Sequence, residues 1–296
     1  MTATPVTTTA PATAAPPTPP RGVRLRFSGV LRSEFIKLFT LRSTFWCILI
    51  VLVLAIGVGL IAATVSPPAR AGVPVVALTN AAQQGQAVQI ANIGTNFGEL
   101  VLAVLGVLVI SGEYGTGMIR STFAAVPKRL PALFAKAIVL GLTAFVVGLI
   151  TIYGTALVTF PLLPGKHIHP DWGSWKVEEA LLGGAVYLTL IALIAFSIGA
   201  IIRNTAGGIA SALGLILVLP GIVDLIYALT QATWLENVAT FTPTSAGGHL
   251  YAYVVTAPVA VSGVVSLDRT TGGLVLLAWF VVLFVVAAVL LKRRDA

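Results

Sequence analysis

Uncharged, apolar stretches of membrane-spanning length recur along this chain of 296 residues. They occupy residues 43–69, 137–165, 180–202, 204–223 and 270–291. About 20 apolar residues are enough for a helix to cross the hydrocarbon core of a bilayer. Charged residues make up 9% of the chain, and a soluble domain of this size could not cover its surface with so few. The sequence therefore predicts an all-α membrane protein with several spans.

Six transmembrane helices are predicted once the less regular apolar segments are included. The second of them is the least regular, because Gly94, Asn96, Gly98 and Glu99 interrupt its first half. The predicted spans are residues 44–65, 90–111, 132–160, 180–202, 207–229 and 272–291.

The positions of lysine and arginine predict the orientation of these spans. With the N-terminus inside, fourteen of the 18 basic residues fall on the inner side, as the positive-inside rule requires. Omitting the second span would destroy this asymmetry. We therefore expect both termini in the cytoplasm and the chain in the plasma membrane. The net charge of +8 is assigned to orientation, so no nucleic-acid partner is expected.

Residues 1–22 are predicted to form a disordered tail ahead of a single transmembrane domain, residues 23–296. The first twenty residues are dominated by threonine, alanine and proline and carry no charged side chain. Such a segment buries too little apolar surface to offset the entropy of ordering. We assign it no function.

Residues 23–42 are predicted to form an amphipathic helix in the inner membrane interface, next to the lipid head groups. Phe27, Leu31, Phe35 and Leu38 recur at helical spacing. Glu34 falls within the same apolar arc, where a lipid surface alone would not favour a carboxylate. Glu34 therefore either contacts another part of a protein or is solvated at the interface.

Two connections are predicted to contain helices of their own. The inner loop after the second span has apolar residues at helical spacing and ends at Pro127, which predicts a short coupling helix along the inner surface. The outer connection, residues 230–271, is long and aromatic, which favours short helices or re-entrant pieces over a free loop.

Residues for chemical catalysis are not apparent in the sequence. No phosphate-binding P-loop motif occurs, and Cys47, within the first span, is the single cysteine. His167, His169 and Asp171 lie close in sequence, but Pro170 interrupts them, so we expect no metal site. We expect no catalytic residue and no enzymatic activity on this chain.

Four segments in order resemble the bacterial exporter permeases of the ABC-2 class. The loop after the second span is the most specific, because Gly112, Glu113, Tyr114, Gly117 and Arg120 all match that pattern. The matching segments are residues 31–38 (LRSEFIKL), 110–122 (ISGEYGTGMIRST), 202–210 (IRNTAGGIA) and 242–247 (TPTSAG).

The resemblance implies a half-transporter that pairs with a second permease chain, as a homodimer, and is driven by an ABC ATPase on a separate polypeptide. ATP and magnesium would bind that ATPase, with no cofactor on this chain. The exported substrate would be a drug, an antimicrobial peptide, a lipid or a similar amphipathic molecule. Residues that the resemblance places in coupling to the ATPase are Glu34, Glu113, Tyr114, Gly117 and Arg120, and those in the substrate pathway are Asn96 and Glu99.

A substitution at Glu113 would test this interpretation most directly. We expect its carboxylate to fix the inner loop against the ATPase or against the first helix near Arg32 and Lys37, although a solvated interfacial acid would also fit the sequence. Two other functions stay open: an ion-coupled secondary transporter or channel, for which Glu99 and Asp224 are the acidic candidates, and a membrane anchor without transport activity.

Overall fold

The computed structural model describes residues 26–65, 79–125, 129–166, 168–254 and 263–293, and within these ranges most of the chain is helical. The predicted tail, residues 1–22, lies outside the described residues. Six helices in the described part are long and apolar enough to span a membrane, which confirms the predicted number. Their bounds are Arg42–Val65, Asn80–Gly115, Leu130–Leu162, Trp175–Ile202, Thr205–Thr230 and Arg269–Arg293.

The helices follow the chain in the order that the sequence predicted. Short single-turn helices at Phe160–Leu162 and Pro164–Lys166 follow α6. The longer elements are α1 (Phe27–Thr40), α2 (Arg42–Val65), α3 (Asn80–Asn92), α4 (Thr95–Gly115), α5 (Met118–Ala125), α6 (Leu130–Thr159), α7 (Trp175–Ile202), α8 (Thr205–Leu213), η4 (Gly214–Val218), α9 (Leu219–Thr230), α10 (Thr233–Thr240), α11 (Pro243–Tyr251) and α12 (Arg269–Arg293).

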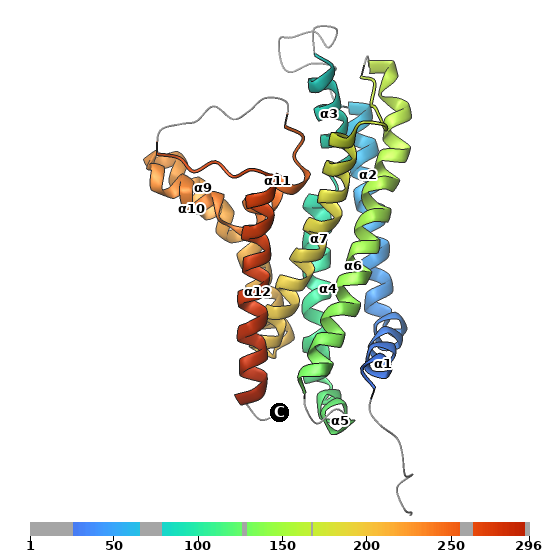
Figure 1. Cartoon of the computed structure of the whole chain (residues 1–296), viewed down its shortest axis with the longest axis vertical. Helices are drawn as coiled ribbons and strands as arrows, with labels where there is room; N and C mark the ends of the chain where they lie inside the picture. The colour runs from blue at the N-terminus through green and yellow to red at the C-terminus, as the bar shows by residue number, and fades with distance from the viewer. Residues whose placement is uncertain (1–25, 66–78, 126–128, 167, 255–262, 294–296) are drawn as a thin grey trace, which may run out of the picture.

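Helix α7 forms the centre of the bundle and packs against α4, α6 and α12 (Figure 1). Its Tyr187 and Phe196 side chains are fully buried. The contact with α4 is close because Gly106 has no side chain: a Cβ atom there would lie 2.3 Å from the carbonyl oxygen of Ala192. Helices α2 and α12 and the fifth span expose most of their apolar side chains, as spans that face lipid do.

The two ends of the bundle carry different elements (Figure 1). Helices α1 and α5 and the last turn of α12 lie at one end, called here the α5 end, whereas the first turns of α3 lie at the opposite, α3 end. Both ends of the described chain are therefore on the same side, as an even number of spans requires. That the α5 end faces the cytoplasm stays a prediction.

Two of the spans are not continuous α-helices. The second breaks at Ile93 and Gly94, between α3 and α4, and the fifth contains the π-helical segment Gly214–Val218 just before Pro220. Thr244 of α11 donates a hydrogen bond to the carbonyl oxygen of Ile216 in that segment, at 3.0 Å. Beyond it, α9 and α10 lean away from the other spans (Figure 1). The irregularity of the fifth span thus combines Pro220 with the preceding π turn, two usual causes of a helix kink.

Candidate functional site

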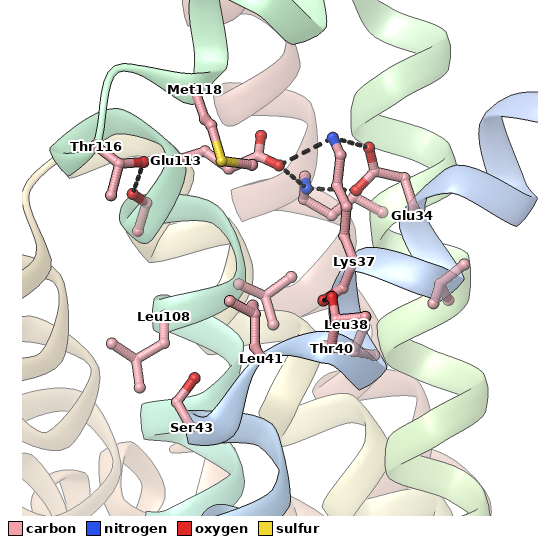
Figure 2. A pocket seen from close by; sticks show the side chains of 14 residues that line it. Glu34, Lys37, Leu38, Thr40, Leu41, Ser43, Leu108, Glu113, Thr116 and Met118 are labelled. Carbon is pink, nitrogen blue, oxygen red and sulfur yellow. Dashed lines mark hydrogen bonds and ion pairs between the residues drawn. The ribbon is translucent and has the colours of Figure 1, made fainter.

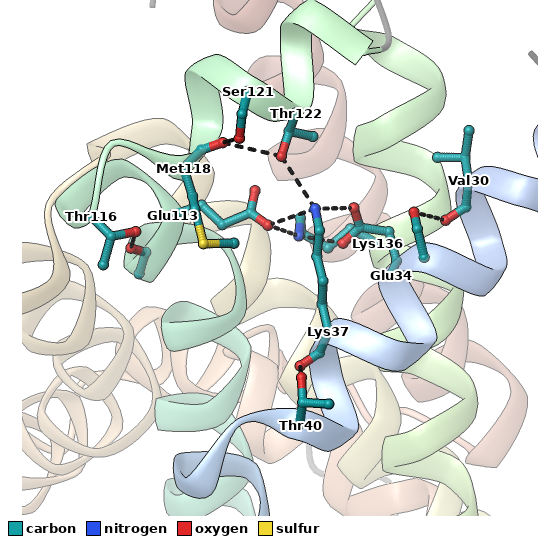
Figure 3. Close-up of polar contacts among 12 residues, drawn as sticks. Val30, Glu34, Lys37, Thr40, Glu113, Thr116, Met118, Ser121, Thr122 and Lys136 are labelled. Carbon is teal, nitrogen blue, oxygen red and sulfur yellow. Dashed lines mark hydrogen bonds and ion pairs between the residues drawn. The ribbon is translucent and has the colours of Figure 1, made fainter.

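Four charged side chains from three helices meet at the α5 end, and we call them the charge cluster. They are Glu34 and Lys37 of α1, Glu113 of α4 and Lys136 of α6 (Figure 3). Lys37 Nζ lies 2.9 Å from Glu34 Oε1 and 3.2 Å from Glu113 Oε1. Lys136 Nζ lies 2.5 Å from Glu34 Oε2 and 2.9 Å from Glu113 Oε1. Each lysine thus bridges the same two carboxylates.

Three members of the charge cluster are removed from solvent. Glu34, Glu113 and Lys136 have exposed fractions of 3%, 7% and 4%, while Lys37 is half-buried. Burying an isolated charge is costly, but here two carboxylates face two ammonium groups, so the formal charges cancel. This balance explains why the apolar arc of α1 contains a glutamate: Glu34 contacts protein, and Val30 and Leu38 on the same face are also buried.

Helix α5 is connected to the charge cluster through a hydroxyl group. Lys37 Nζ donates a hydrogen bond to Thr122 Oγ1 at 3.2 Å, and that hydroxyl donates in turn to the carbonyl oxygen of Met118. Burial by itself lowers the pKa of Lys37, but the hydrogen bonds and the charges of Glu34 and Glu113 outweigh it, so its pKa is raised above the usual value. The ammonium form of Lys37 is therefore the form that links α1, α4 and α5.

A cavity of about 360 Å³ adjoins the charge cluster between α1, α2, α4 and α6 (Figure 2). Its walls are mainly apolar, with Leu38, Leu41 and Leu108 among the lining residues, and the charged groups lie at one side of it. Glu113 Oε2 is buried and has no hydrogen-bond partner among the described residues. The α5 end therefore combines buried ion pairs with a mainly apolar cavity beside them.

The remaining residues predicted for coupling lie near the charge cluster but outside it. Tyr114 faces the other way, with the guanidinium of Arg203 5.3 Å from its ring centre. Gly117 forms the turn between α4 and α5 with φ of 74°, a left-handed conformation that favours glycine. Arg120 lies on α5, and its side chain is outside the described part. Arg32 and Lys37 are the two predicted partners of Glu113 within the chain. Arg32 is exposed, whereas Lys37 donates a hydrogen bond to Glu113.

The two residues predicted for the substrate pathway face different surroundings. Asn96 is exposed and lines a second cavity of about 340 Å³ at the α3 end, together with Asn92, Tyr251 and Tyr253. Glu99 is 6% exposed and points instead into the bundle, where it accepts a hydrogen bond from the Tyr187 hydroxyl of α7. The structure therefore does not bring Asn96 and Glu99 onto one surface.

Sequence reasoning missed Lys136, Tyr187 and Tyr251. Lys136 had been counted only as one of the basic residues on the inner side. A lysine six residues inside an otherwise apolar helix was the available signal, because a charge at that depth calls for a partner. No comparable signal marked the two tyrosines, because an uncharged tyrosine is an ordinary residue in an apolar segment.

The described residues contain no arrangement of side chains that would bind a metal ion. No group of three or more histidine, cysteine, aspartate or glutamate side chains is arranged to hold a metal ion in this part of the chain. His167 of the predicted histidine segment lies outside the described residues. His169 and Asp171 are held on α3 by Gln83 and Gln84 through backbone hydrogen bonds. What the charge cluster can do is mechanical: it joins helices through charges that are costly to separate.

Comparison with known proteins gives one family match. The model of a family described as ABC-2 family transporter protein matches residues 29–296, which include all six spans, the charge cluster and Glu99. No curated protein matches the sequence.

Proposed function

Because this chain belongs to the family of ABC-2 transporter proteins, we propose that it is the permease subunit of an ATP-driven exporter in the bacterial plasma membrane. The observation that carries the proposal is the charge cluster, which joins α1, α4 and α6 and contacts α5 at one end of the bundle. The exported molecule is a drug, an antimicrobial peptide, a lipid or a similar amphipathic compound.

The energy comes from a separate ABC ATPase subunit. The sequence has no P-loop whose backbone N–H groups could hold the phosphates of ATP. ATP and magnesium therefore bind the partner, and two copies of this chain form the membrane-spanning part with two ATPase subunits. The α5 end, predicted to face the cytoplasm, is the end at which that partner docks.

The charge cluster passes motion from the docked ATPase to the spans. When the ATPase subunits close on ATP, they displace α5 and α1, which carry Thr122, Glu34 and Lys37. Separating these groups from Glu113 and Lys136 would leave buried charges unpaired at a cost of about 3–5 kcal/mol. The ion pairs therefore hold, and α4 and α6 move together with the two shorter helices. The turn at Gly117 connects α5 directly to the end of α4.

A substitution at Glu113 tests this role. Glu113→Gln keeps the shape of the side chain and removes the charge that joins α4 to both lysines. In proteoliposomes containing the chain and its ATPase, we expect transport to fall at least about tenfold and substrate to stop stimulating ATP hydrolysis. Glu179→Gln is the matched control, because Glu179 is ion-paired with Arg269 on the other side of the bundle. It should leave both measurements unchanged.

A double variant separates coupling from stability. Glu113→Gln with Lys37→Gln leaves Glu34 and Lys136 as one balanced pair, so the charge cluster stays neutral and the chain should fold well. Coupling should remain low, because α4 is still disconnected from α1. If the double variant restores wild-type transport, or if Glu113→Gln transports normally with normal stimulation, the coupling role is wrong.

One observation favours an ion-coupled transporter as the second candidate, namely the carboxylate of Glu99 buried within a span. The two functions differ in energy source. Transport into inside-out vesicles that requires ATP and survives collapse of the proton and sodium gradients by ionophores supports the exporter. Transport that continues without ATP and stops with the ionophores supports the second candidate.

A further inference from the structure

Glu99 lies deep within the membrane-spanning part of α4. It precedes Glu113 by fourteen residues, which corresponds to about 21 Å along a helix. The charge cluster marks one end of the bundle, so Glu99 is roughly two-thirds of the way across a hydrocarbon core of about 30 Å. An ionisable side chain at this depth is costly and is found mainly where it binds a partner or a transported ion.

The described residues supply Glu99 with hydroxyl and aromatic neighbours but no basic one. Tyr187 of α7 donates a hydrogen bond to Glu99 Oε2, and Tyr251 at the end of α11 is close enough to interact with the carboxylate electrostatically. The Tyr187 and Tyr251 ring centres are 5.1 Å apart. Within the described part of the chain, no lysine or arginine is ion-paired with Glu99. The position is thus a buried carboxyl group without a basic partner among the described residues.

A carboxylate beside two tyrosine rings has the chemistry that recognises an ammonium group. The carboxylate accepts short, charge-assisted hydrogen bonds from N⁺–H, and the faces of aromatic rings attract a cation. A neutral hydroxyl would gain less, because its hydrogen bond to the carboxylate carries no net charge attraction.

A route from Glu99 leads to the cavity of about 340 Å³ at the α3 end. Tyr251 lines this cavity and also packs against Tyr187, so it stands between the cavity and the carboxylate. The cavity walls offer uncharged amides, including Asn92, whose Oδ1 atom is buried and has no partner among the described residues. A small displacement of Tyr251 would connect this polar cavity with Glu99.

We propose that Glu99 is the anionic subsite for the ammonium group of a cationic, amphipathic substrate, which leaves it through the α3-end cavity past Tyr251. The apolar part of the substrate would remain in the cavity and the adjoining spans. This inference rests on the proposed transport function and adds the substrate class, namely organic amines rather than neutral or anionic molecules.

Binding of a simple amine tests the proposal. Phenylbutylammonium is the probe and phenylbutanol its uncharged counterpart, each titrated calorimetrically against the purified chain in maltoside micelles, which contain no charged or amine group. We expect the wild-type chain to bind the ammonium more tightly than the alcohol. Glu99→Gln should weaken ammonium binding about ten- to a hundredfold and leave alcohol binding unchanged. Equal ammonium binding by the wild-type chain and Glu99→Gln would overturn the proposal, as would equal wild-type binding of ammonium and alcohol.

Glu236→Gln is the matched control, because Glu236 also accepts a hydrogen bond from a tyrosine, Tyr227, at 3.0 Å, but in the exposed hairpin of α9 and α10. It should bind both probes as the wild-type chain does. If Glu236→Gln weakens ammonium binding as much as Glu99→Gln does, the effect is one of general charge and the assignment of Glu99 is wrong. Adding short-chain phosphatidylethanolamine as competitor identifies the source of the amine. If this lipid displaces the probe at equal concentration, the site binds a lipid head group rather than a transported amine, and the proposed substrate class is wrong.

Chemical labelling of the wild-type chain avoids reliance on a folded variant. Dicyclohexylcarbodiimide modifies carboxyl groups in apolar surroundings, and mass spectrometry locates the modified residue. We expect phenylbutylammonium, but not phenylbutanol, to protect Glu99. Equal protection by both probes, or by neither, contradicts the proposal. These measurements need no ATPase, so loss of amine binding leaves the ATP-driven function standing, and failure of ATP-driven transport leaves the binding result standing.

Discussion

At the scale of single residues, the α5 end depends on a balance of two acids and two bases. Lys136 is the more buried of the two lysines and lies on a long span, so it fixes the cluster to the bundle. Its ammonium group donates to Glu34 and Glu113, which belong to different helices. Removing it would leave two buried carboxylates facing one half-buried lysine.

Lys136→Met should therefore lower the free energy of unfolding by about 3–5 kcal/mol, the usual cost of stranding a buried charge. Lys37→Met should cost less, because Lys37 is half-buried and water can replace part of its interaction. Thermal denaturation of the purified chain in detergent gives the order. Lys176→Met, at an exposed position on α7, serves as the control and should melt as the wild type does. A smaller loss for Lys136→Met than for Lys37→Met would contradict the assignment.

The raised pKa of Lys37 predicts a dependence of stability on alkaline pH. A base whose pKa is higher in the folded state than its usual value of 10.5 stabilises the fold fully below that value. This contribution disappears as the pH rises through the folded-state pKa. The difference in melting temperature between the wild type and Lys37→Met should hence be constant up to about pH 10 and shrink above it. A difference that grows with alkaline pH would show that Lys37 is not held by the two carboxylates.

The sequence predicted part of the candidate site and could not predict the rest. The proximity of Glu113 to Lys37 was predicted, because each residue belongs to a recognisable sequence segment that lies next to the same membrane boundary. The pairing of Glu34 with Lys136, separated by 102 residues, was not, because it depends on how α1 lies against α6. Tyr187 was missed for the same reason, because its role depends on the hydrogen bond from its hydroxyl to Glu99, which lies 88 positions earlier in the chain.

At the scale of helices, packing within the bundle is closest where α4 crosses α7. Gly106 lies at this crossing, directly on the backbone of α7, whereas Gly112 on the same helix has nothing within 4 Å of the place where a Cβ would lie. The two glycines thus lie on the same helix but in different surroundings, one packed and one open.

Alanine at these two positions should have opposite effects. Gly106→Ala forces α4 away from the Ala192 carbonyl and should cost about 1–3 kcal/mol, the usual range for overpacking. Gly112→Ala meets open space and should be neutral or stabilising by up to about 1 kcal/mol, from helix propensity. Unfolding in sodium dodecyl sulfate followed by circular dichroism measures both. Equal effects of the two substitutions would argue against the close α4–α7 crossing.

Helix number was predictable because it depends on local composition, but the start of the second span, predicted at residue 90 and found at Asn80, and the helix irregularities were not. Five of the six spans follow from apolar length alone, and the irregular second span follows from the asymmetry of lysine and arginine as well. The break at Ile93 and the π turn at Gly214–Val218 depend on which helices pack alongside, and the Thr244 contact that supports the π turn comes from another element. The packed face of α1 was also not apparent, since Phe27 and Phe35 of the predicted apolar stripe are exposed and Val30 packs instead.

At the scale of the whole molecule, charge is distributed unequally between the two ends. Lys136 and Lys37 lie at the α5 end, with the lysine and arginine residues that close α12. Two functions are assigned to opposite ends: coupling to the ATPase at the α5 end, and release from the amine site through the cavity at the α3 end. Both assignments require the α5 end to be cytoplasmic, which makes the orientation of the chain the most consequential prediction.

Cysteine labelling in intact cells tests the orientation. In a Cys47→Ser background, cysteines at Lys176 and Gln231, exposed residues at the first turn of α7 and just after α9, should react with a membrane-impermeant maleimide from outside. Cysteines at Ser121 on α5 and Lys292 in the last turn of α12 are also exposed, but they should react only after permeabilisation. The physical reason is the positive-inside rule, which retains loops rich in lysine and arginine in the cytoplasm.

Each possible pattern of labelling has a distinct meaning for this prediction. The background chain must remain unlabelled, and all four variants must react fully in detergent, so that accessibility rather than folding decides the result. External labelling at Ser121 and Lys292 alone would invert the chain and place the charge cluster outside, where no ATP-driven partner can reach it. External labelling at Lys292 but not at Ser121 would separate two positions that six crossings place on one side, and would contradict the six-span arrangement itself.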